Sequence, residues 1–171
     1  MSVVDFDPPE RFVAGTVGPP GQRVFFLQAS DSRRSVSVSL EKEQVRLLGE
    51  RLSDLVGRLP EAPAIEEAVK VLVDNDPLTS PIEDEFRVDT LALSWDQARH
   101  VVVVEAFDSD PEEATEASVQ SLRVSLSPRH ALAFARRCDS VVRAGRPNCP
   151  FCSLPLDPQG HICPRANGYR R

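Results

Sequence analysis

Alternating apolar and polar residues predict three short strands near the start of the chain. They cover residues 11–17 (RFVAGTV), 23–29 (RVFFLQA) and 34–40 (RSVSVSL), separated by the turn-rich segments GPPG and SDSR. From residue 41 to residue 59 the pattern changes, and apolar side chains recur at steps of three and four. This spacing predicts a helix with one apolar face, formed by Val45, Leu48, Leu52, Leu55, Val56 and Leu59.

The second half of the chain shows the same order of patterns. Strands are predicted at residues 85–94, 100–107 and 119–126, followed by a helix from Pro128 to about Ala144. Ser127 is suited to cap this helix, and Pro128 is suited to its first position. Both halves therefore have three strands followed by one helix.

The two halves also match residue by residue at an offset of 86. Residues 38–40 and 124–126 are both Val-Ser-Leu, and the apolar helix position of Leu52 falls on Cys138. We therefore expect an α+β fold of duplicated βββα units, with antiparallel sheets packed on helices. The alternative is a chance match, because many strand-then-helix segments can be aligned in this way.

These patterns predict a domain of residues 1–144 and a tail of residues 145–171. The domain contains units at about 11–60 and 85–144, joined by an acidic linker at 61–84 in which Ile65, Val69 and Leu72 could form a short helix. The linker acids could suggest metal binding or acid/base catalysis, but a solvated connector explains them more simply. We make that interpretation for Asp74, Asp76, Glu83, Asp84 and Glu85.

Three of the four cysteines and one of the three histidines lie in the tail. They form a Cys-Pro-x-Cys pair and, eight residues later, a His-x-Cys pair. Three thiolates and one imidazole are a common tetrahedral ligand set for structural zinc. We therefore predict a zinc-binding knuckle with no open position for water, held by Cys149, Cys152, His161 and Cys163. A redox dithiol at Cys149 and Cys152 is the alternative.

Charge is distributed unevenly along the chain. Residues 123–171 contain nine arginines and two acids, which gives +7, so a formal net charge of −6 leaves −13 for residues 1–122. A basic end can contact phosphate, an acidic partner or the acidic body itself. We expect a protein partner and at most weak nucleic-acid binding, with contacts from Arg143, Arg146, Arg165, Arg170 and Arg171.

Nothing in the sequence suggests a membrane protein. A membrane-spanning helix needs an apolar run of roughly 18 residues, and the N-terminal MSVVDFDPPERF lacks the basic and apolar regions of a signal peptide. The expected location is cytoplasmic, where clustered cysteines are more often metal ligands or redox groups than disulfides.

Four segments resemble an actinobacterial family of uncharacterised proteins, DUF3090. They are FDPPERFVAGTVG at 6–18, SVSLEKEQV at 37–45, EFRVDTLALSWD at 85–96 and the closing GRPNCPFCSLPLDPQGHICPRANGYRR. The resemblance implies a bacterial protein of unknown function and covers almost the whole chain. No catalytic residue is established for the family, so none is carried over.

Two functions from different classes remain. The preferred one is a non-catalytic binding or adaptor protein with a zinc-containing, basic C-terminal docking segment. The alternative is an enzyme that acts on a phosphorylated or otherwise anionic small molecule and uses arginines as anion clamps. Convergence of Arg136, Arg143, Arg146 and Arg165 in a pocket with a carboxylate would favour the enzyme.

Protein purified without chelators should contain about one zinc ion per chain, measured by elemental analysis. Replacing Cys149, Cys152, His161 or Cys163 singly should lower that content, because each would supply one of the ligands. Cys138→Ser is the matched control, since a cysteine on a buried helix face should not bind the metal. Zinc-free protein, or equal loss of zinc in the control, would contradict the assignment.

Overall fold

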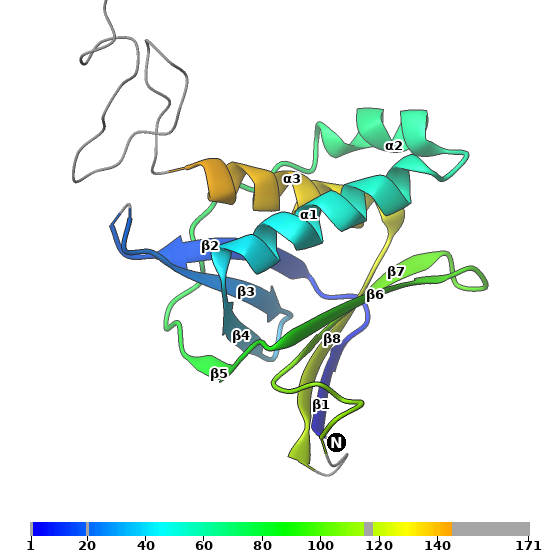
Figure 1. The fold of residues 1–171 in the computed structure, drawn as a ribbon. Coiled ribbons are helices and arrows are strands. Elements are labelled where there is room, and N and C mark those ends of the chain that lie inside the picture. Colours follow the sequence, from blue (N-terminus) through cyan, green and yellow to red (C-terminus); the bar gives the residue numbers. More distant parts are fainter. Residues whose placement is uncertain (1, 20, 115–117, 145–171) are drawn as a thin grey trace, which may run out of the picture.

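The computed structural model describes residues 2–19, 21–114 and 118–144 of the 171-residue chain. Within these ranges the chain forms eight strands in two four-stranded sheets and three helices (Figure 1). The predicted α+β class is confirmed. The predicted zinc knuckle at residues 145–171 lies outside the described residues.

The first sheet has the strand order β2-β3-β4-β5. Its antiparallel part consists of β2 (Arg11–Val17), β3 (Val24–Ser30) and β4 (Ser35–Leu40). These bounds agree with the predicted ranges to within one residue. β5 (Asp84–Arg87) comes from later in the chain and pairs in parallel with β4.

The second sheet has the strand order β1-β8-β7-β6. Its antiparallel part consists of β6 (Thr90–Asp96), β7 (Val101–Phe107) and β8 (Gln120–Leu126). β1 (Ser2–Phe6), which the sequence patterns did not predict, pairs in parallel with β8. Each sheet is therefore an antiparallel meander with one added parallel strand.

The added strand of each sheet comes from the other half of the chain. β1 precedes β2 but lies beside β8, and β5 precedes β6 but lies beside β4. The chain passes from the first sheet to the second at residues 88 and 89. Val88 N–H donates to the carbonyl of Ser39 in the first sheet (2.8 Å), and Asp89 N–H donates to that of Phe107 in the second (2.8 Å). The prediction of one strand at 85–94 is therefore wrong.

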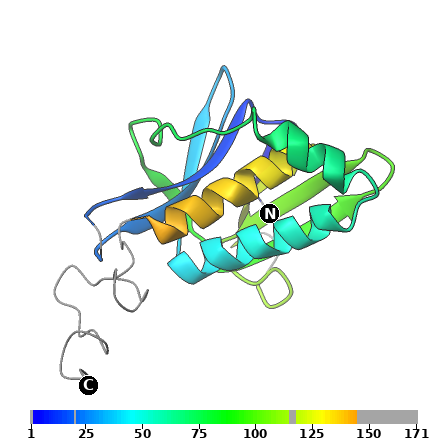
Figure 2. The ribbon, with the colours of Figure 1, turned by 90° about the horizontal axis from the view of Figure 1, so that it is seen from above.

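Two long helices, α1 (Lys42–Gly57) and α3 (Pro128–Arg143), lie side by side and run in opposite directions (Figure 2). The predicted cap of α3 is confirmed, because Ser127 Oγ accepts a hydrogen bond from His130 N–H (3.3 Å). The shorter α2 (Ala62–Val69) packs against α3. In the described part of the chain, no helix is both long and apolar enough to cross a membrane.

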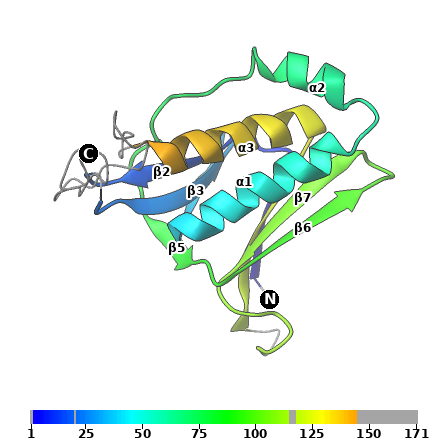
Figure 3. The same ribbon diagram turned by 45° about the horizontal axis from the view of Figure 1, so that its top comes forward.

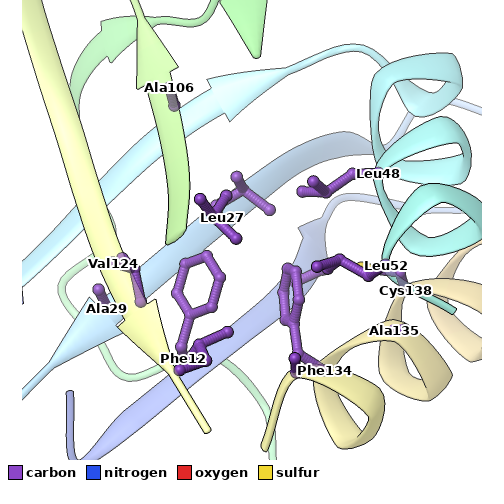
Figure 4. Packing of buried hydrophobic residues seen from close by; sticks show 14 of the residues in the cluster. Phe12, Leu27, Ala29, Leu48, Leu52, Ala106, Val124, Phe134, Ala135 and Cys138 are labelled. Atoms are coloured by element: carbon purple, nitrogen blue, oxygen red, sulfur yellow. The ribbon is translucent and has the colours of Figure 1, made fainter. Parts of the chain in front are cut away.

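The main hydrophobic core lies between these helices and the sheets (Figure 4). Leu52 and Cys138 are both 0% exposed, which confirms that both predicted helix faces are buried. Burial raises the pKa of the Cys138 thiol and keeps it protonated. This cysteine therefore serves as a small core side chain.

The two helices approach each other closely at Gly49. A Cβ atom at this position would lie 2.9 Å from Cys138 Cβ and 3.3 Å from the Ala135 carbonyl oxygen. Real Cβ atoms do not approach a carbon so closely, so only glycine allows this helix separation. The contact holds α1 and α3 together as one layer.

Gly49→Ala should therefore lower the free energy of unfolding by about 1–2 kcal/mol, because overpacking outweighs the gain in helix propensity. Urea unfolding followed by circular dichroism measures the change. Gly57→Ala in the same helix is the control: no atom lies within 4 Å of its added Cβ, so stability should stay equal or rise by less than about 1 kcal/mol. Equal effects at the two positions would contradict the close contact.

Candidate functional site

Residues 70–79, which we call the strap, contain no helix or strand and lead from α2 past the edge strand β2 (Figure 3). Leu78 of the strap is buried against Val13 and Phe26. The buried side chain of Gln28 holds the next residue by two hydrogen bonds. Its Nε2 donates to the carbonyl of Thr79 (3.0 Å), and its Oε1 accepts from Thr79 N–H (2.8 Å). The strap is thus fixed to the first sheet.

Two arginines hold the middle of the strap at Asp74. Arg11 donates from Nε and Nη2 to the two carboxylate oxygens, at 2.7 and 3.1 Å. Arg137, whose side chain is 10% exposed, donates from Nη1 to the backbone carbonyl of Asp74 (2.6 Å) and from Nε to that of Ala14 (2.8 Å). The interpretation of Asp74 as a solvated linker residue is therefore wrong.

These contacts change the acid–base properties of the three side chains. The hydrogen bonds from Arg11 lower the pKa of the Asp74 carboxyl, and the same bonds raise the pKa of Arg11. Burial lowers the pKa of Arg137, although the nearby Asp74 opposes this. An aspartate with a lowered pKa stabilises the fold in its charged form, so the strap is held most strongly at neutral pH.

The strap covers the groove between α3 and β2. Leu72 and Asp74 line the cavity of about 430 Å³ that remains there, together with residues of α3 and β2. The rings of Phe12 and Phe134 stack in its floor with centroids 4.3 Å apart. We call this the α3–β2 groove, and Leu72 and Asp74 of the strap form part of its wall.

Strand pairing places β2 and β6 at corresponding positions in the two sheets. In the first sheet, Ala14, Leu27 and Val38 are paired side by side across the three antiparallel strands. In the second sheet, Leu93, Val104 and Val124 are paired in the same way. The two sets correspond because Val38 and Val124 match at the offset of 86. By the same strand alignment, Leu91 of β6 corresponds to Phe12 of β2. By the offset of 86, Arg51 of α1 corresponds to Arg137 of α3. The correspondence is one of position, and the duplication of the sequence stays a prediction.

The counterpart of the α3–β2 groove lies between α1 and β6, and we call it the α1–β6 groove. Its volume is about 850 Å³, roughly twice that of the other cavity. α1 contacts β6 much less than α3 contacts β2. Its apolar lining is formed by Leu47, Leu48, Leu55, Leu59, Leu91, Leu93 and Trp95. No segment of the described residues covers it as the strap covers its counterpart.

Charged residues surround this apolar lining. Arg51, Arg58, Asp54 and Asp89 line the α1–β6 groove, and both arginines are exposed. Within residues 2–19, 21–114 and 118–144, neither arginine side chain makes a hydrogen bond or ion pair. Arg137, which corresponds to Arg51, by contrast donates to the backbone carbonyl of Asp74 in the strap and to that of Ala14 in β2.

The sequence matches, over residues 4–163, the family described as "Protein of unknown function (DUF3090)". The chain belongs to the DUF3090 family. Searches of curated proteins and of solved structures found no match. The family therefore brings no activity or residue role to this DUF3090 protein, and its chemistry has to be argued from its own geometry.

Of the arginines that the sequence suggested for a site in this DUF3090 protein, the structure describes two, Arg136 and Arg143. Arg136 pairs with Glu66 (2.5 Å), and Arg143 pairs with Asp139 (3.1 Å), both at exposed positions. The remaining suggested residues lie outside the described ranges: Arg146, Arg165, Arg170, Arg171 and the four predicted zinc ligands. Among the described residues there is no cluster of three or more His, Cys, Asp or Glu that could hold a metal ion.

Sequence patterns did not predict the roles of Arg11 and Arg137 or the presence of the α1–β6 groove. The pairing of Arg11 with Asp74 joins residues 63 positions apart, and no local pattern reports such a contact. A signal for Arg137 was nevertheless present. The offset of 86 sets it against Arg51, so both helices carry an arginine beside their apolar face.

Asp74→Asn should lower the free energy of unfolding at pH 7 by about 1 kcal/mol, a value reduced for partial solvent exposure. The folded-state pKa of Asp74 lies below its unfolded value, so its contribution is present above the unfolded pKa and is lost as pH falls through the folded pKa. Urea unfolding of both proteins at neutral and acidic pH measures this. A stability difference that is equal at all pH values would contradict the ion-pair explanation.

Proposed function

We propose that this DUF3090 protein is a non-catalytic binding or adaptor protein that holds a segment of another protein in the α1–β6 groove. The observation that carries the proposal is the contrast between the two corresponding grooves. The strap lines one of them and leaves a cavity of about 430 Å³, whereas no segment of the described residues covers the other, whose volume is about 850 Å³.

The composition of the α1–β6 groove supports protein binding. Apolar surface surrounded by charged residues is typical of protein interaction sites, because a partner that covers it removes that surface from water. Leu47 is 39% exposed on the side of α1 that lines the groove. Trp95, which is only partly buried, offers the type of side chain that dominates many interfaces.

The arrangement of the arginines favours binding over the alternative, an enzyme acting on a phosphorylated or anionic small molecule. Such an enzyme needs arginines that converge and remain available to the substrate. Arg136 and Arg143 each pair with a separate acid. Arg11 and Arg137 do converge, but their ligand is the carboxylate of Asp74 in the same chain.

The predicted tail belongs to the same proposal. We propose that Cys149, Cys152, His161 and Cys163 bind a structural zinc ion, and that the basic residues Arg146, Arg165, Arg170 and Arg171 add a second contact with a protein partner. Nucleic acid is proposed as a weak partner only, because the acidic body repels it. The sequence supports these proposals through ligand spacing and charge.

A photo-crosslinking amino acid at position 47, in the cells from which the protein comes, should form a covalent adduct with one partner protein. The same amino acid at position 71 is the control, because Val71 is 86% exposed and does not line the groove. Trp95→Ala, combined with the crosslinker at position 47, should reduce the yield because it removes apolar contact area. Gel electrophoresis and mass spectrometry measure and identify the adducts.

Equal yields at positions 47 and 71 would contradict the proposal, because they would indicate random collisions. A crosslink from position 47 to residues 145–171 of the same chain would also contradict it. The groove would then be occupied from within the protein.

A further inference from the structure

We propose that the α1–β6 groove recognises a segment of a partner protein that resembles the strap: extended, apolar, and carrying one carboxylate that pairs with Arg51. This inference rests on the proposed function and adds the chemistry of the partner. The strap shows how the corresponding part of this fold holds such a segment.

The strap shows what α3 and β2 require of their ligand. Its Asp74 offers a carboxylate to Arg11 and a backbone carbonyl to Arg137. Leu72 supplies an apolar contact in the groove, whereas Leu78 anchors the strap against Val13 and Phe26 on the other face of the sheet. The strap forms no strand pairing with β2, so side chains of the scaffold select it.

Arg51 occupies the position on α1 that Arg137 occupies on α3. Both lie one turn after an apolar pair at the groove, Leu47 and Leu48 on α1, and Ala133 and Phe134 on α3. Arg51 has no partner among the described residues, and an unpaired guanidinium attracts carboxylates. Charge complementarity therefore predicts an acidic residue in the ligand at this point.

The differences between the grooves predict a weaker and reversible interaction. Thr90 stands where the α3–β2 groove has Arg11, so the carboxylate would lose the two hydrogen bonds that Arg11 gives to Asp74. Asp54 and Asp89 also line the α1–β6 groove and repel further acids. We therefore expect one carboxylate in the ligand rather than an acidic run.

The apolar contacts are correspondingly larger on this side. Leu47 of the α1–β6 groove corresponds to the smaller Ala133 of the α3–β2 groove. Leu91 corresponds to Phe12, and the stack of Phe12 on Phe134 has no aromatic counterpart in the α1–β6 groove. Trp95 lies at the position that corresponds to Thr16. More apolar area and less charge suit a ligand with large apolar residues flanking its carboxylate.

The strap itself supplies the probe. A synthetic peptide of residues 70–79, KVLVDNDPLT, has apolar residues on both sides of its two aspartates and contains no tryptophan or tyrosine. Trp95 is the sole tryptophan of the chain and lines the groove, so its fluorescence reports occupancy. Titration of the full-length protein with this peptide should give a saturable change in Trp95 emission.

Matched variants test the role of Arg51. Arg51→Gln should weaken peptide binding about twofold to fivefold, because one exposed charge-assisted contact is lost. Arg46→Gln is the control, since Arg46 lies on the same helix but pairs with Glu50 (2.6 Å) and does not line this groove. A peptide with both aspartates changed to asparagine should bind the wild type as weakly as the original peptide binds Arg51→Gln.

No saturable change in Trp95 emission, or equal affinity of wild type and Arg51→Gln, would overturn this inference. The second result could occur while position 47 still crosslinks to a partner protein. The groove would then be a docking site without preference for a carboxylate, and the proposed function would stand. Loss of the crosslink to a partner would remove both.

Discussion

The close contact of α1 with α3 at Gly49 is the constraint on which the rest of the structure depends. It brings Cys138 and Ala135 against the backbone of α1 and makes the two helices one layer. Because the helices run antiparallel, α3 lies beside the edge strand of the first sheet and α1 beside that of the second (Figure 2). Each groove therefore lies between one helix of this pair and the edge strand beside it.

Among the described residues, a segment of the chain lies over one groove of this scaffold and none lies over the other. After α1, residues 62–79 form α2 and the strap, whose Asp74 and Leu78 are anchored to the first half. The groove beside α1 has a larger apolar surface and two arginines, Arg51 and Arg58, whose side chains have no partner among the described residues. The comparison of the two grooves is therefore the basis of the proposed binding surface.

The sequence predicted the elements whose side chains follow a regular period. The antiparallel strands of the first sheet and both long helices agree with their predicted ranges, because half-buried strands and helices impose periods that local sequence records. β1 was missed, and 85–94 was predicted as one strand, because pairing between distant segments decides both. The candidate groove could not be predicted for the same reason. It depends on which helix lies over which edge strand, and no local pattern contains that information.

The exchange of β1 and β5 between the sheets also determines when the chain can fold during synthesis. The first sheet lacks β5 until residue 87 has left the ribosome, and β1 has no strand partner until β8 follows, more than a hundred residues later. Contacts so distant in sequence form slowly and leave strand edges open in the meantime. During synthesis β1 therefore remains an unpaired strand until β8 has been made, which exposes it to wrong pairing for longer than any strand of the first meander.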